Sequence, residues 1–265
     1  MIAQDPYGVL NSWNDSFHFC DWTGVTCGKR HRRVTYLELT SQGDEMKFID
    51  SLKNCTKLEW LDLGTCKFQG VLPRSIGNLS NQLYRLYLDG NQIHGNLPGS
   101  IVNLVGLELI SLEDNRFTGN IPFTIGNLQR LQVIYLYNNQ LSGTIPNSMG
   151  NLSLLSTLDL SLNMLEGVIP SSLGNCHKLL ELYLSGNKLH GKIPARLLQL
   201  SSLSKTMNLS QNNLYGSLPN EVGDLKMLSN LDISNNNLSG ITFLVALMVV
   251  LVFQGCLSKA TYFKV

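Results

Sequence analysis

Hydrophobic and polar positions alternate in short stretches that recur along most of the chain. In one such stretch Ile134 and Leu136 alternate with Val133, Tyr135 and Tyr137. Successive side chains of a β-strand point to opposite faces, so this pattern predicts a strand with one buried and one exposed face. We expect the isoleucine and the leucine to enter a core and the other three side chains to face solvent.

The residues after this strand predict the rest of a coil. Asn139 ends the strand, and Gly143 permits a tight turn. Ile145 and Pro146 are predicted to start a second extended segment, in which the proline suits an edge position. Residues 149–152 are predicted to close the coil as a short 3₁₀ or helical turn. One coil cannot bury its leucines alone, so its neighbours must stack on it.

The same pattern returns at a regular spacing, as Leu-x-x-Leu-x-Leu-x-x-Asn-x-Leu-x-Gly-x-Ile-Pro. The step is 24 residues and lengthens to 25 after two of the copies, which begin at Leu58, Leu83, Leu107, Leu131, Leu155, Leu179, Leu203 and Leu228. A period of this length with these leucines predicts a leucine-rich-repeat solenoid. The expected fold class is an α/β solenoid: a horseshoe with a parallel β-sheet on its concave face and short 3₁₀ or helical segments on its convex side.

One asparagine recurs at the end of each predicted strand. Its side-chain amide can bond backbone groups that the turn into the neighbouring coil leaves unpaired. We therefore expect a buried structural ladder, in which Cys66 replaces the asparagine of the first repeat. The members of this ladder are Asn91, Asn115, Asn139, Asn163, Asn187, Asn212 and Asn236.

Composition and motifs narrow the function. The net charge is +1 and 15% of the residues are charged, which gives no sign of a nucleic-acid surface. The five histidines are scattered, and neither a glycine-rich phosphate loop nor a catalytic constellation occurs. Solenoids expose long surfaces that mostly bind other molecules. The sequence therefore predicts a binding protein that is not an enzyme and has no cofactor or metal site.

The exposed positions of the predicted strands form the candidate binding surface. Adjacent strands lie ~4.8 Å apart, so we expect Tyr87, Glu113, Tyr135 and Tyr183 to form one contiguous patch. Aromatic side chains with a few charges suit the binding of a peptide or protein. Tyrosine also favours exposed strands for its own sake, and this alternative stays open. The candidate partner-binding residues are Trp60, Arg85, Tyr87, Asp89, Glu113, Tyr135, Tyr137, Asp159, Glu181 and Tyr183.

Two motifs resemble plant proteins. The Leu-x-Gly-x-Ile-Pro segment resembles the plant-specific class of leucine-rich repeats, and its seven versions end at Pro73, Pro98, Pro122, Pro146, Pro170, Pro194 and Pro219. Residues 5–14, followed by Cys20-Asp-Trp-Thr-Gly-Val-Thr-Cys27, resemble the N-terminal cap of plant leucine-rich-repeat receptors. A solenoid needs such a cap, because its first coil would otherwise expose its core to water.

Together with residues 44–57, these motifs make the chain similar to part of a plant leucine-rich-repeat receptor-like kinase, of the group that includes bacterial-pattern immune receptors. The resemblance implies a disulfide between Cys20 and Cys27. It also divides the chain into a truncated cap (1–33), a first strand with an irregular segment (34–57), eight repeats of which the last is incomplete (58–241), and an apolar tail (242–265).

Asn-x-Ser/Thr acceptors mark candidate N-glycosylation sites at Asn14, Asn54, Asn78 and Asn151. Asn78 and Asn151 fall in the convex turn, where a glycan would leave the concave face open. Glycosylation and a disulfide presuppose an extracellular location, and the resemblance implies the outer side of the plasma membrane. No secretion signal is visible before the cap, however.

The apolar tail allows two interpretations. Residues 241–257 are about as long as the shortest membrane spans. Lys259 and Lys264 follow on the side that the positive-inside rule favours for the cytoplasm. The segment is therefore a candidate membrane anchor. The alternatives are a β-rich or helical plug over the last open coil, or out-of-frame or intronic sequence.

The function expected from these features is that of a non-catalytic ectodomain fragment in plant signalling or defence. Its partners would be a peptide or protein ligand, a co-receptor kinase ectodomain, or both. One alternative is a soluble inhibitor resembling the polygalacturonase-inhibiting proteins, which share this repeat type and lack a kinase. Another is a truncated gene product with no role of its own.

Overall fold

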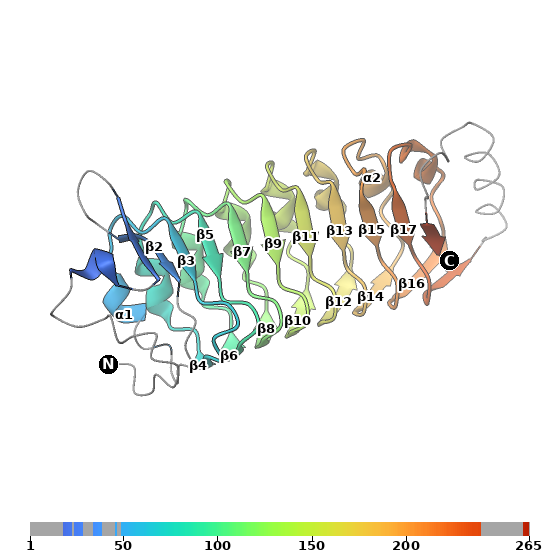
Figure 1. Ribbon diagram of the computed structural model, residues 1–265. Coiled ribbons are helices and arrows are strands. Elements are labelled where there is room, and N and C mark those ends of the chain that lie inside the picture. Colours follow the sequence, from blue (N-terminus) through green and yellow to red (C-terminus); the bar gives the residue numbers. More distant parts are fainter. Residues whose placement is uncertain are drawn as a thin grey trace.

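The computed structural model describes residues 18–22, 24–28, 34–38, 46, 49–239 and 262–264, with only the backbone for Phe19, Ser51 and residues 262–264. These residues form an elongated stack of similar coils that runs from one end of the molecule to the other (Figure 1). Most coils contribute one strand to each of two sheets. The predicted leucine-rich-repeat solenoid with a parallel main sheet is confirmed.

The first sheet has eleven strands among the described residues, and their order follows the chain. Its first pair is antiparallel, and all its other pairs are parallel. The strands are β1 (Val25–Cys27), β2 (Val34–Glu38), β3 (Trp60–Asp62), β5 (Arg85–Tyr87), β7 (Leu109–Ser111), β9 (Val133–Tyr135), β11 (Thr157–Asp159), β13 (Glu181–Tyr183), β15 (Thr206–Asn208), β17 (Asn230–Asp232) and β19 (Tyr262–Lys264).

The second sheet has eight parallel strands among the described residues. They are β4 (Gln69–Val71), β6 (Gln92–Asn96), β8 (Arg116–Asn120), β10 (Gln140–Thr144), β12 (Met164–Val168), β14 (Lys188–Gly191), β16 (Asn213–Ser217) and β18 (Asn237–Ser239). The predicted tight turn at Gly143 and the extended segment starting at Ile145 are therefore wrong. Gly143 lies inside β10 with φ 71°, a backbone conformation that glycine adopts without strain.

Short helical turns close the coils on the side opposite the first sheet (Figure 1). In each of the central coils a proline, for example Pro146, precedes the turn. The predicted turn after Pro146 is confirmed as η7, which begins earlier than expected, at Asn147. The coil-closing turns are η4 (Arg74–Asn78), η5 (Gly99–Asn103), η6 (Phe123–Asn127), η7 (Asn147–Asn151), η8 (Ser171–Asn175), α2 (Ala195–Leu198) and η9 (Asn220–Asp224), while α1 (Ile49–Leu52) precedes the first repeat.

The core is a continuous column of leucine and isoleucine side chains between the two sheets and the helical turns. In the central coil, Leu131, Ile134, Leu136, Leu141 and Ile145 are at most 2% exposed. Burial of each such side chain contributes about 1.5–3 kcal/mol. Every coil continues the same cluster, so each one supplies a wall for its neighbour.

The asparagine ladder joins each coil to the one before it. Asn139 donates from Nδ2 to the carbonyl oxygens of Leu112, Leu136 and Tyr137 at 3.0–3.2 Å, and its Oδ1 accepts from Phe117 N at 2.9 Å. The other six ladder asparagines repeat this arrangement. Cys66, in the first repeat, is buried instead, and burial raises the pKa of its thiol to about 12.

Both ends of the first sheet carry strands that do not belong to the repeats. β1 of the cap pairs with β2, and β19 pairs in parallel with β17, Asn230 lying opposite Tyr262. The strand β19 thus covers the edge of β17, the first-sheet strand of the last repeat. The candidate membrane segment 241–257 lies outside the described residues, within which no helix is long and apolar enough to cross a membrane.

Candidate partner-binding face

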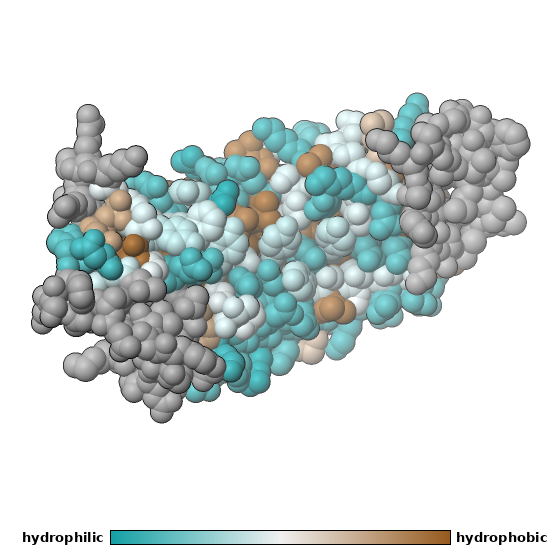
Figure 2. Space-filling model, viewed as in Figure 1, coloured by the Kyte–Doolittle hydropathy of each residue, from teal (hydrophilic) through white to brown (hydrophobic). Residues whose placement is uncertain are grey.

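The exposed side of the first sheet, here called the strand face, carries all ten candidate residues. Side chains at the third, fifth and seventh positions of a repeat, counted from its first leucine, lie on this face and form three rows across the strands. In the copy that begins at Leu203 the equivalent positions fall one residue later. All ten candidates are half-buried, as expected for side chains that stand side by side. In Figure 2 the described surface is mostly hydrophilic or neutral, with hydrophobic residues only in scattered spots.

The register corrects the predicted contiguous patch. Tyr87, Tyr135 and Tyr183 occupy the fifth-position row, where Ser111 and Asp159 alternate with them. Glu113 lies in the seventh-position row and therefore does not separate Tyr87 from Tyr135. It reaches the fifth-position row through Ser111, whose Oγ donates to Glu113 Oε2 at 2.7 Å.

Aromatic side chains cluster at the N-terminal end of the strand face. The ring of Trp60 lies 5.3 Å from the rings of both Tyr36 and Tyr87, and 6.5 Å from that of Tyr84. The guanidinium of Arg85 lies 4.6 Å above the Trp60 ring, a cation–π arrangement. Sequence reasoning found Trp60, Arg85 and Tyr87. It missed Tyr36, which lies before the first repeat. It also missed Tyr84, which is the second residue of its repeat and so falls outside the three rows.

Three acidic side chains, those of Asp62, Asp89 and Glu113, follow these aromatics on neighbouring repeats. Burial raises the pKa of Asp62, and the charges of Asp89 and Glu38 raise it further, although the Gly64 N–H that Asp62 accepts at 3.1 Å opposes the shift. Burial likewise raises the pKa of Glu113. The hydrogen bond from Ser111 lowers this pKa, and the charges of Asp89 and Asp114 raise it. This part of the strand face therefore concentrates negative charge that is partly withdrawn from water.

The centre of the strand face is also aromatic and acidic. Tyr135 and Tyr137 meet edge to face at 6.5 Å. Burial raises the pKa of both phenols, and nearby carboxylates raise it further, so both stay neutral at physiological pH. Beyond them, Glu181 Oε1 forms an ion pair with Lys205 Nζ at 3.0 Å. Phenol hydroxyls and carboxylates together can accept hydrogen bonds and hold cations.

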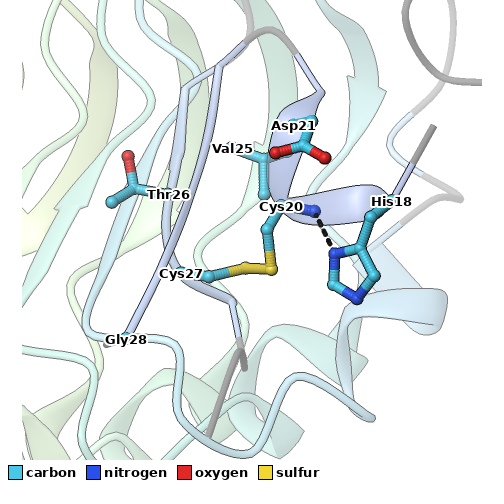
Figure 3. Close-up of a pocket in the computed structure, with 7 residues that line it drawn as sticks. All are labelled: His18, Cys20, Asp21, Val25, Thr26, Cys27 and Gly28. Carbon is cyan, nitrogen blue, oxygen red and sulfur yellow. Dashed lines mark hydrogen bonds between the residues drawn. A yellow bond between two sulfur atoms is a disulfide. The ribbon is translucent and has the colours of Figure 1, made fainter. Parts of the chain in front are cut away.

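The cap carries the disulfide that the resemblance implies. Cys20 and Cys27 are bonded, with their Cα atoms 5.5 Å apart, and line a shallow hollow with His18, Asp21 and Thr26 (Figure 3). His18 Nδ1 accepts a hydrogen bond from Cys20 N at 3.2 Å. The disulfide thus holds the 3₁₀ turn η2 (Phe19–Asp21) against β1, next to the first coil.

The candidate glycosylation sites lie away from the strand face. Asn54, Asn78 and Asn151 are exposed, and the last two end the helical turns η4 and η7. Asn14 lies outside the described residues. Glycans on the three described sites would therefore leave the strand face open.

The fold and this face define a class of protein: a leucine-rich-repeat solenoid that presents aromatic and acidic side chains on an exposed parallel sheet. Family models agree along most of the repeats. A leucine rich repeat N-terminal domain matches residues 2–28, and leucine rich repeat models match residues 57–79, 82–104, 106–128 and 129–189. The chain belongs to the leucine-rich-repeat proteins with the N-terminal domain of plant receptors.

Its relatives are plant receptor kinases. The chain is 48% identical over 68 residues to the LRR receptor-like serine/threonine-protein kinase EFR of Arabidopsis thaliana, a match that covers 26% of this chain and 7% of that protein. It is similar, with a TM-score of 0.83 and 36% identity, to the LRR ectodomain of the receptor kinase GASSHO1/SCHENGEN3 from Arabidopsis thaliana, solved in complex with CASPARIAN STRIP INTEGRITY FACTOR 2; 87% of this chain and 28% of that one are covered.

A third similarity is to the Arabidopsis receptor kinase HAESA, solved in complex with the peptide hormone IDA and the co-receptor SERK1. The TM-score is 0.70 at 26% identity, and the match covers 89% of this chain and 48% of that one. The chain thus spans less than half the length of each of these relatives. The kinases match it only in their leucine-rich-repeat part.

Proposed function

We propose that this chain is the binding part of a plant receptor-like protein in signalling or defence, without catalysis of its own. An extended peptide or protein ligand would lie across the strand face, and a co-receptor kinase ectodomain would join it there. The observation that carries this proposal is the row of half-buried Tyr87, Tyr135 and Tyr183, which lie on every second strand of the first sheet. Aromatic side chains in such a row offer a large contact area with little conformational entropy to lose.

The relatives support the same interpretation. GASSHO1/SCHENGEN3 and HAESA were both solved as ectodomains with peptide or protein factors bound, the latter together with a co-receptor. The proposed contact residues are the ten candidates Trp60, Arg85, Tyr87, Asp89, Glu113, Tyr135, Tyr137, Asp159, Glu181 and Tyr183. The soluble-inhibitor alternative is not favoured, because curated relatives of high identity are receptor kinases.

We place this binding part outside the cell, at the plasma membrane. Disulfides such as Cys20–Cys27 form in oxidising compartments. Exposed Asn54, Asn78 and Asn151 are acceptors for glycans added on the same route. In this arrangement the cap would cover the first coil and the repeats would supply the binding surface. The apolar tail would attach the chain to the membrane or cover the last coil.

The proposal is tested by selecting random extended peptides from a display library on the full chain, secreted through an oxidising route. We expect selected peptides to bind the wild type and to lose at least about tenfold in affinity for a Tyr135→Ala/Tyr183→Ala variant, because each removed aromatic costs at least about 1 kcal/mol. Binding is measured by surface plasmon resonance.

Tyr215 supplies the matched control. It is 52% exposed on β16 of the second sheet, so Tyr215→Ala removes an equally large side chain away from the strand face. Selected peptides should bind this variant as they bind the wild type. A library that yields no binder, or binders that ignore the double substitution, would contradict the proposed function.

A further inference from the structure

Asp62, Asp89 and Glu113 form one connected group on three neighbouring repeats, here called the carboxylate group. Asp89 lies over Gly64: a Cβ on that glycine would come within 2.9 Å of Asp89 Oδ1. Asp62 accepts from the N–H of the same Gly64. The hydroxyl of Ser111 lies 3.3 Å from Asp89 Oδ1 and 2.7 Å from Glu113 Oε2. The lack of a side chain at Gly64 and the small Ser111 thus let the three carboxylates approach one another.

Two members of this group, Asp89 and Glu113, differ from the aspartates of the fifth-position row, which include Asp62 with its bond from the Gly64 N–H. Asp159 accepts from the backbone N–H and the hydroxyl of Ser161, at 2.9 and 2.5 Å, and Asp232 does the same with Ser234. These aspartates therefore brace the turn after their own strand. In the repeats of Asp89 and Glu113, the acidic side chains themselves occupy the seventh position, where the repeats of Asp159 and Asp232 carry that serine. Such bracing does not explain why carboxylates stand there.

No cation of the described residues balances the carboxylate group. The ion pairs among the described residues are Arg130–Glu108 and Lys205–Glu181, and neither includes a member of the carboxylate group. Arg85, four residues before Asp89, lies over the rings of Trp60 and Tyr84, at 4.6 and 5.7 Å, and Arg116, three residues after Glu113, is exposed on β8 of the second sheet. Uncompensated charges that are half-buried raise the free energy of the unbound face, and a cationic partner would lower it.

We propose that the carboxylate group selects a basic ligand: an extended peptide segment with at least two Lys or Arg side chains close together in its sequence. This proposal rests on the proposed function of the strand face. Three strands span about 10 Å, which an extended chain crosses in about three residues. Guanidinium and ammonium groups can bridge adjacent carboxylates by charge-assisted hydrogen bonds. Trp60 and Tyr87, packed beside the group, supply apolar contact for the methylene stems of the basic side chains.

The test uses the peptides selected on the wild-type chain, together with a synthetic pair that differs only in charge. One peptide carries Arg at alternate positions of a Gly/Ser dodecamer and the other carries Glu. We expect enrichment of Lys and Arg among selected peptides, and tighter binding of the Arg dodecamer than of the Glu dodecamer, with an affinity that falls as salt is raised.

An Asp62→Asn/Asp89→Asn/Glu113→Gln variant keeps the shape of the face and removes its charge. It should bind the basic peptides at least about tenfold more weakly, because the charge-assisted hydrogen bonds to the three carboxylates are lost. Glu166→Gln is the matched control, since Glu166 is exposed on β12 of the second sheet. Circular dichroism checks that each variant is folded.

The outcomes separate the two proposals. Peptides that bind through Tyr135 and Tyr183 but are neutral or acidic, and that bind the triple variant as well as the wild type, would overturn the basic-ligand proposal and leave the proposed function standing. Failure to select any strand-face binder would overturn both. Equal losses in the triple variant and in Glu166→Gln would show a general electrostatic effect and would also overturn the role of the carboxylate group.

Discussion

At the residue scale, each recurring polar side chain has a defined partner. The ladder asparagines bond backbone N–H and carbonyl groups that the stacked turns leave unpaired. Since successive coils have the same unpaired groups, the asparagine recurs from coil to coil, and the sequence shows this recurrence. The residue before each ladder asparagine adopts a left-handed conformation, as at Asp114 (φ 53°) and Asn138 (φ 51°), and Gly90 and Gly186 occupy it in two repeats. Asparagine, aspartate and glycine tolerate this conformation well. Two neighbouring positions therefore mark the end of the first-sheet strand in these repeats, and Leu162 and Gln211 adopt the same conformation in two of them.

Replacement of one ladder asparagine tests its structural role. Asn139→Ala would leave Phe117 N–H buried without its partner. The carbonyls of Leu112 and Leu136 would each lose one of two donors and keep the other, from Asn115 and Asn163. The orphaned N–H costs about 1–3 kcal/mol and the lost bonds to the carbonyls add to it, so we expect the free energy of unfolding to fall by about 2 kcal/mol or more. Urea unfolding followed by circular dichroism measures this. Gln140→Ala, at an exposed neighbouring position, should change it little, and equal midpoints for the two variants would contradict the prediction.

At the element scale, the helical turns set how closely coils stack. Gly77, Gly126 and Gly150 occupy the same place in η4, η6 and η7, where a Cβ would collide with the carbonyl oxygen of a serine in the next turn. Their role is close approach, since none of the three has a positive φ. The helical turns can therefore stack at the same distance as the strands of the sheet only if this position lacks a side chain.

A pair of glycine substitutions tests this spacing. In Gly150→Ala the new methyl group would collide with the Ser172 carbonyl oxygen and force two coils apart, so we expect a loss of about 1–3 kcal/mol in unfolding free energy. Gly99, at the start of η5, has no heavy atom within 4 Å of its Cβ position. Gly99→Ala should therefore be neutral or slightly stabilising. Thermal unfolding of both variants measures the difference, and a similar midpoint for the two would refute the spacing argument.

At the scale of the whole molecule, each coil contacts only its neighbours, so the ends matter most. The cap and its disulfide cover the first coil, and β19 pairs with the last repeat's strand. In a solenoid of this kind, loss of an end unit exposes the next coil and unfolding can spread from there.

Removal of the cap disulfide should therefore have a local and directional effect. Cys20→Ser/Cys27→Ser opens a short loop, which the chain-entropy model relates to about 2–3 kcal/mol. We expect faster hydrogen exchange in β1, β2 and β3, and little change in β11 and β13. Cys55→Ser, at a half-buried thiol outside the disulfide, is the control. Uniformly faster exchange along all the repeats would show that the molecule unfolds as one unit.

The sequence by itself determined the repeat period, the buried leucines, the asparagine ladder and the parallel main sheet, because each follows from side chains within one coil and its copy. Only the tertiary structure decided the second sheet. Its strands pair residues 22 apart, as Ser142 with Met164, while the first sheet pairs residues 24 apart, as Tyr135 with Asp159. This offset depends on the positive φ of glycines such as Gly143, which sequence spacing does not reveal.

The sequence did not predict the carboxylate group either. Sequence reasoning named Asp89 and Glu113 as candidate residues, but it did not predict that they lie together with Asp62. Periodicity places side chains in rows, but the contacts between rows depend on what stands between them. Here a missing side chain at Gly64 and one hydroxyl at Ser111 bring Asp62, Asp89 and Glu113 together. The proposal that the strand face binds a partner follows from the sequence. The charge selectivity proposed for it depends on packing, because only stacked coils bring carboxylates from separate repeats within reach of one ligand.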